Sequence, residues 1–135
     1  MGLKDPRGGF NSVTEFVGSG LPWVISGSAT STVTRHRFDK ITKRIIVKNH
    51  EAAGTRLRVG FTENGVNGVE GQFYFGVDGG DLFDFDARIK EVFILRDGAT
   101  DVDYSLYAEL TMIDSDMMPI LTGSLEGSAY WNGIG

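Results

Sequence analysis

The chain has 135 residues, a net charge of −5 and no cysteine. A chain of this length forms one domain that buries about two thirds of the surface of the unfolded chain. These features exclude a multidomain protein and a disulfide-stabilised module. No apolar run reaches the ~20 residues of a membrane-spanning helix, so we expect no direct membrane insertion.

Three regions follow one another along the chain. Residues 1–20 are rich in glycine and polar residues, so we expect a flexible N-terminal arm without the apolar stretch of a signal peptide. Residues 21–113 form the predicted domain, and residues 114–135, where the apolar alternation ends, form the predicted C-terminal tail. The domain contains eight candidate strands: residues 23–26, 30–38, 40–49, 56–62, 72–77, 82–86, 88–96 and 102–112.

Apolar and polar residues alternate along these segments, most clearly between residues 102 and 112. Val102, Leu106 and Met112 belong to the apolar set of this segment, whereas Asp103 and Glu109 belong to its polar set. A period of two is typical of a strand that buries one face. We therefore expect the following side chains to face the space between two sheets: Phe61, Phe75, Phe93, Leu106 and Leu110.

Turn residues separate the candidate strands. The pairs Asn64-Gly65, Asn67-Gly68, Gly79-Gly80 and Asp97-Gly98 combine residues that tolerate a positive φ. Short strands joined by such turns favour an all-β fold, and in particular an eight-stranded antiparallel jelly-roll sandwich (Greek key) with flexible N- and C-terminal arms. An immunoglobulin-like sandwich is the alternative, although the chain has no cysteine pair.

Charge is distributed unevenly between the two halves of the chain. Residues 1–60 contain ten basic and four acidic residues, whereas residues 61–135 contain three basic and fourteen acidic residues. Opposite charges therefore meet either between strands of one subunit or between patches on two neighbouring subunits, and the sequence leaves both interpretations open. The second interpretation gives a candidate subunit interface, which comprises Arg35, Arg37, Lys43, Arg44, Arg56, Arg58, Asp78, Asp81, Asp84, Asp86, Tyr74 and Tyr107.

Two groups within this candidate interface have other interpretations. The four aspartates between residues 78 and 86 offer the oxygen ligands that calcium prefers, but the EF-hand spacing is missing. A solvated strand edge is the simpler interpretation of these aspartates. Tyr74 and Tyr107 lie on the polar parity of their strands, where tyrosines either stack on sugar rings or cover a subunit interface.

No motif in the sequence predicts catalysis. The nucleophile motif G-x-S-x-G, the P-loop and the dinucleotide motif G-x-G-x-x-G do not occur, and His36 and His50 are not spaced with carboxylates as in a zinc site. We therefore expect that the chain is not an enzyme and has no cofactor. Residues 35–58 are basic, but the acidic net charge and the lack of a binding motif argue against nucleic acid as a partner.

Four segments carry a resemblance to a known family: VTRHRFDKITKRIIVKN (33–49), LRVGFTENGVNG (57–68), FDARIKEVFIL (85–95) and YSLYAELTMI (104–113). Together they resemble the small single jelly-roll capsid proteins of large icosahedral double-stranded DNA viruses, over roughly residues 23–113. The resemblance implies a penton-type structural protein that forms a homopentamer at the fivefold vertex of the virion.

The resemblance also implies partners and a location. Neighbouring major and minor capsid proteins would be the partners, the host cytoplasm would be the place of assembly, and no cofactor would be present. The alternative is a carbohydrate-binding, lectin-like jelly-roll module with a role in host attachment. A further alternative from the residues alone, an enzyme, is the least favoured.

Overall fold

The structure of the protein is a computed structural model that describes residues 20–68 and 71–117. Its elements are β1 (Leu21–Ala29), β2 (Thr34–Arg37), β3 (Lys40–Asn49), β4 (Leu57–Gly60), α2 (Glu63–Asn67), β5 (Tyr74–Val77), β6 (Leu82–Phe85), β7 (Glu91–Arg96), β8 (Val102–Asp114) and the 3₁₀ helix η1 (Ser115–Met117). Apart from Gly20 and residues 114–117, the predicted arm and tail lie outside the described residues.

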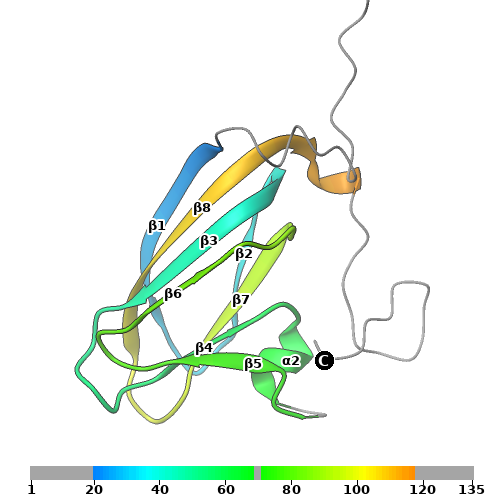
Figure 1. Cartoon of the computed structure of the whole chain (residues 1–135). Helices are drawn as coiled ribbons and strands as arrows, with labels where there is room; N and C mark the ends of the chain where they lie inside the picture. Colours follow the sequence, from blue (N-terminus) through cyan, green and yellow to red (C-terminus); the bar gives the residue numbers. More distant parts are fainter. Residues whose placement is uncertain (1–19, 69–70, 118–135) are drawn as a thin grey trace, which may run out of the picture.

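The eight strands form two antiparallel sheets (Figure 1). The first sheet has the order β1-β8-β3-β6, and the second sheet has the order β2-β7-β4-β5. Every pairing within the two sheets is antiparallel. For the described residues, the prediction of an all-β fold with eight antiparallel strands is therefore confirmed.

The main hydrophobic core lies between the two sheets. It contains Val47 of β3, Val59 of β4, Ile94 of β7 and Leu106 of β8, each at most 1% exposed. Because alternate side chains of a strand point to opposite faces, one face of each strand contributes to this core. Leu106 and Leu110 belong to the core as predicted, and Phe61 packs against it while partly buried.

Aromatic side chains close the two lateral edges of the sandwich. Where β1 and β2 lie, the Trp23 ring contacts the rings of His36 and Phe38 at centroid distances of 6.0 and 4.9 Å. Where β5 and β6 lie, Phe75 stacks on Phe83 with the ring centroids 3.9 Å apart, and Phe83 packs against the main core. Phe75 thus faces inward as predicted, but it is 53% exposed because β5 is an edge strand.

The alternation along β8 reverses near its end. The predicted parity holds as far as Leu110, but beyond it Thr111 and Ile113 are buried and Met112 is 59% exposed. The pairing between β3 and β8 shifts its register in this region, and such a bulge moves following side chains to the other face. The Thr111 hydroxyl donates to a β3 carbonyl oxygen at 2.7 Å. The prediction that Met112 faces inward is therefore wrong.

The segment between β4 and β5 is not a simple turn, because it contains the short helix α2. The hydroxyl oxygen of Thr62 accepts a hydrogen bond from the N–H of Gly65 at 2.9 Å, which caps the helix. Gly68 ends the helix with a φ of 76°. Of the two Asn-Gly pairs expected here, the second therefore provides a left-handed glycine, whereas Gly65 lies within the helix.

Helix α2 covers the outer face of the second sheet. Val66 of the helix packs with Phe93 and Leu95 of β7 in a second hydrophobic cluster. Phe93 is buried, with 7% of its surface exposed, but it does not face the main core. It pairs in register with Gly60 of β4, and Val66 of the helix lies against Gly60 on the outer face of the sheet. The prediction that Phe93 faces the space between the sheets is therefore wrong, because the helix provides a second place to bury an apolar side chain.

Candidate subunit interface

Arg44 connects three strands on the outer face of the first sheet. It lies on β3, and its guanidinium donates two hydrogen bonds to the Asp84 carboxylate of β6, at 2.9 and 2.5 Å. The carboxylate of Glu109 on β8 lies 3.9 Å from the same guanidinium. The hydrogen bond from Arg44 lowers the pKa of Asp84. Two residues of the candidate interface thus pair within one chain.

Arg58 has a similar role on the outer face of the second sheet. Its Nε donates to the Asp97 carboxylate at 2.9 Å, and its Nη1 donates to the Val66 carbonyl oxygen of α2 at 3.1 Å. The guanidinium carbon lies 4.4 Å from the centre of the Tyr74 ring, a cation–π contact. Arg58 therefore joins β4, α2, β5 and the loop after β7.

The other basic residues of the candidate interface lie in different surroundings. Arg35 of β2 forms an ion pair with the nearly buried Glu91 of β7 at 2.6 Å. Arg37 at the end of β2 is exposed, and Lys43 of β3 is half-buried. Arg56 precedes β4, is exposed, and places its guanidinium over a glycine of β5. The structure therefore distributes the six basic side chains over both sheets.

The four aspartates are likewise spread along the chain between β5 and β7. Asp78 accepts hydrogen bonds from the backbone N–H groups of Gly54 and Gly79 at 2.9 and 2.8 Å, and these bonds lower its pKa. Asp81 and Asp86 are exposed on either side of β6. Within the described residues, no three histidine, cysteine or acidic side chains come together in a group that could hold a metal ion.

The two tyrosines of the candidate interface have partners in the chain. The Tyr107 hydroxyl donates to the Glu109 carboxylate at 3.2 Å, and partial burial together with that carboxylate raises the Tyr107 pKa. One face of the Tyr74 ring is covered by Arg58. The structure thus brings Arg44, Asp84 and Tyr107 near Glu109 on one sheet and Arg58 near Tyr74 on the other.

His36 is a half-buried residue with an inward contact that the sequence did not reveal. It lies on β2, and its Nε2 is 2.6 Å from the hydroxyl of the buried Tyr104. Burial lowers the pKa of His36 from its usual value of 6.5. Its position between Arg35 and Arg37 suggests a surface residue, but alternation turns its side chain toward the core while the two arginines point outward.

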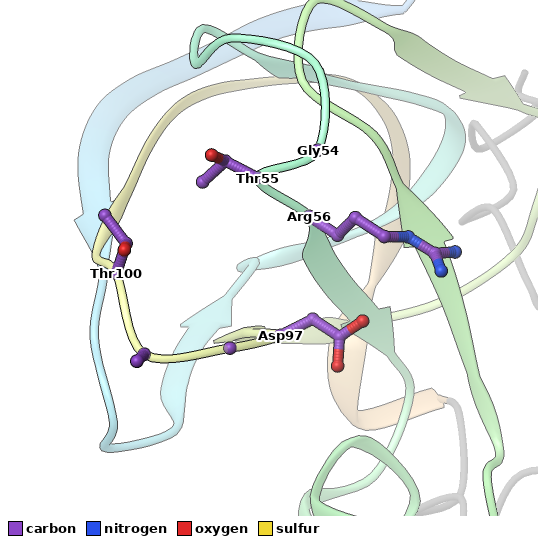
Figure 2. Close-up of a pocket in the computed structure, with 7 residues that line it drawn as sticks. Gly54, Thr55, Arg56, Asp97 and Thr100 are labelled. Atoms are coloured by element: carbon purple, nitrogen blue, oxygen red, sulfur yellow. The ribbon is translucent and has the colours of Figure 1, made fainter.

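The surface hollows of the described residues are open to solvent. One hollow of about 80 Å³ lies between the loops around residues 54–56 and 97–100 (Figure 2). Figure 2 shows Thr55 and Thr100 on facing loops, whereas the side chains of Arg56 and Asp97 lie to one side. This hollow is smaller than the ~300 Å³ at which small-molecule sites begin. Wider hollows of about 350 and 530 Å³, both open to solvent, lie beside Asp84 and beside Arg37.

None of the helices in the described part of the chain has the length and apolar character needed to cross a membrane.

The sequence matches no family model, and no curated protein matches it. Among solved structures, the chain is similar to the plu4264 protein of Photorhabdus luminescens, with a TM-score of 0.40 and 10% identity over 71% of this chain. It is also similar to a structure of Bacillus endospore appendages, which form disulfide-linked pili, with a TM-score of 0.40 and 19% identity. The second similarity covers 66% of this chain and 85% of the appendage chain. The chain spans 65% of the Photorhabdus protein, which is less than two thirds of its length.

Proposed function

We propose that the chain is a jelly-roll capsid subunit of the penton type, which forms a homopentamer at the fivefold vertex of an icosahedral double-stranded DNA virus. The observation that carries this proposal is the pairing of β1 with β8, β2 with β7, β3 with β6 and β4 with β5. Each strand of the first half thus pairs with its counterpart in the second half, as in one long hairpin wrapped into two sheets. This order supports a jelly roll, a fold of viral capsid domains and lectins.

The segments that resemble capsid proteins support the same proposal. They contribute strands to both sheets, because residues 33–49 include β2 and β3, residues 57–68 include β4, and residues 104–113 lie in β8. In this proposal the partners are further copies of the chain and the neighbouring major and minor capsid proteins. The protein acts in the virion and assembles in the host cytoplasm, without binding nucleic acid.

Two contacts favour the capsid subunit over a carbohydrate-binding module. A tyrosine that stacks on a sugar uses a free ring face, and Arg58 already occupies one of the two faces of the Tyr74 ring. The hydroxyl of Tyr107 is engaged with Glu109. Each of the two tyrosines that suggest sugar binding in the sequence thus already makes a contact within the subunit.

Native mass spectrometry of the full chain tests the proposal. A pentamer has five times the 14.7 kDa mass of one chain, and we expect this species at micromolar concentration. Electron microscopy of particles assembled with the neighbouring capsid proteins should then place the pentamer at the vertices. A monomer that binds immobilised glycans and forms no pentamer would contradict the proposal and favour the lectin-like module.

A further inference from the structure

His36 joins the two sheets through the interior at one lateral edge of the sandwich. β1 is an edge strand of the first sheet and β2 is an edge strand of the second sheet, and we call the side where they lie the β1/β2 edge. The Nε2 atom of His36 on β2 lies 2.6 Å from the hydroxyl oxygen of Tyr104 on β8. This hydrogen bond therefore connects the edge of the second sheet to a central strand of the first sheet.

The groups around the His36 ring are uncharged at neutral pH. Trp23 of β1 contacts the ring edge-on, with the ring centroids 6.0 Å apart, and Phe38 packs against Trp23. Val92 of β7 pairs with His36 in the strand register and is completely buried. Among these groups Tyr104 alone can titrate, and burial raises its pKa. A neutral imidazole fits such surroundings, whereas an imidazolium loses its hydration there.

The charged side chains of β2 and of the neighbouring β7 lie on the other face of the second sheet. Arg35 and Arg37 flank His36 and are exposed, because alternate side chains of a strand point to opposite faces. Glu91 of β7 forms its ion pair with Arg35 at 2.6 Å. A positive charge on His36 would therefore have two cationic neighbours along β2, while the Glu91 carboxylate is bound to Arg35.

Few contacts hold β2 on the rest of the molecule. The strand has four residues, and within the described part of the chain it pairs with β7 alone. By contrast, β8 has thirteen residues and lies between two strands. Local opening requires the least free energy where backbone pairing and apolar contacts are fewest. The contact between His36 and Tyr104 is therefore an important part of what holds β2 on the interior.

We propose that protonation of His36 opens the β1/β2 edge, because β2 separates from the interior when the imidazolium moves into water. This inference goes beyond the proposed function, since it concerns the fold of one subunit. In the neutral pair one hydrogen atom lies between Nε2 and the Tyr104 oxygen. A protonated ring has hydrogen atoms on both nitrogens and a charge without a counter-ion in the interior, so the exposed ring binds the proton more tightly than the inward ring.

The size of the effect follows from the linkage between protonation and opening. Burial lowers the pKa of His36 in the closed edge, whereas a ring exposed by opening has the ordinary value of 6.5. The open state therefore binds more protons, and the closed state becomes less stable as the pH falls. Below pH 6.5 the equilibrium constant for opening should rise about tenfold per pH unit, until the pH reaches the pKa of the closed state.

Hydrogen exchange of the full chain, followed by NMR, tests the inference. The measurement compares the protection factors of the β2 and β8 amides between pH 7.5 and 5.5, at urea concentrations below the unfolding transition. We expect the β2 amides to be at least about tenfold less protected than the β8 amides, and to lose about tenfold in protection per pH unit below pH 6.5. Their exchange should depend little on urea, because local opening exposes little surface, whereas exchange in β8 should depend steeply on urea.

The two histidines of the chain give a matched pair of variants. His36→Gln retains a polar group for the Tyr104 hydroxyl but gains no charge in this pH range, so the β2 protection factors should stay constant. His50→Gln is the control, because His50 is exposed and its Nε2 lies 2.7 Å from the Ser105 hydroxyl. This variant should respond to pH as the wild type does. If circular dichroism shows that His36→Gln does not fold, His36→Phe replaces it, since a phenyl ring retains the contact with Trp23.

Three kinds of result would overturn the inference. Equal protection and equal urea dependence of the β2 and β8 amides would mean that the edge opens only when the whole domain unfolds. An unchanged response in His36→Gln, or a lost response in His50→Gln, would mean that His36 does not control the edge. Protection of β2 that stays constant or rises in acid would mean that the closed edge holds the imidazolium, for example by a cation–π contact with Trp23. Each result is independent of the pentamer, which native mass spectrometry tests separately.

Discussion

Leu106→Ala should destabilise the protein strongly, whereas the same truncation at Met112 should have little effect. Both residues lie on β8, six positions apart, and the simple alternation of the sequence places them on the same inner face. In the structure Leu106 is completely buried between β1 and β3, but Met112 is 59% exposed beyond the bulge. The pair therefore tests the structure against the sequence pattern.

The magnitude follows from what each truncation removes. Leu106→Ala deletes three carbon atoms, which costs about 2.4 kcal/mol at ~0.8 kcal/mol for each buried methylene group. If the neighbouring strands relax only in part, a void of about 50 Å³ adds about 1.2 kcal/mol at ~24 cal/mol per Å³. The expected loss in the free energy of unfolding is about 3.6 kcal/mol, whereas an exposed side chain such as Met112 should change it by less than ~0.5 kcal/mol.

Urea denaturation followed by circular dichroism measures both values, provided that unfolding is cooperative and the m-value is unchanged. In thermal unfolding, the Leu106→Ala loss corresponds to a fall in Tm of roughly 10 to 15 °C for a domain of this size. Equal losses for the two variants would refute the reversal of parity at the bulge. A loss below ~1 kcal/mol for Leu106→Ala would refute its place in the core.

Three further predictions concern charge and backbone. Burial lowers the His36 pKa below its unfolded value of 6.5, so the unfolded state binds more protons than the folded state. Tm should therefore fall as the pH decreases from about 7.5 to 5.5. A His36→Gln variant with the same pH dependence of Tm would contradict this prediction. Arg58→Gln should lower the free energy of unfolding, measured in urea, by about 1 to 3 kcal/mol, because the Asp97 carboxylate and the Val66 carbonyl oxygen lose their donor. Arg56 is exposed, so Arg56→Gln should change the free energy of unfolding by less than ~0.5 kcal/mol. Gly79→Ala should lower Tm, because the added methyl group would overlap the backbone carbonyl oxygen of Ala52. Gly98→Ala should leave Tm unchanged, because the added methyl group would lie in open space. Equal Tm values for the two variants would refute the close packing at Gly79.

The number and type of the strands could be predicted from the local sequence alone. A period-two pattern reports which face of a strand is apolar, and this signal depends only on neighbouring residues. It therefore located Leu106 and Leu110 in the core without knowledge of the partner strands. The glycine turns at Gly68 and Gly80 were also readable, because a left-handed φ favours glycine wherever it occurs.

Which distant residues meet could not be predicted from the sequence. Three ion pairs join positions 39 to 56 residues apart: Arg35 with Glu91, Arg44 with Asp84, and Arg58 with Asp97. The charge pattern of the sequence was equally compatible with pairing within one subunit and pairing between two subunits. The bulge that exposes Met112 and the helix that buries Phe93 on the outer face arise from the registers of neighbouring strands and the path of a loop. Strand register and long-range pairing depend on two segments together. The local pattern of one segment therefore cannot specify the register or the pairing partner.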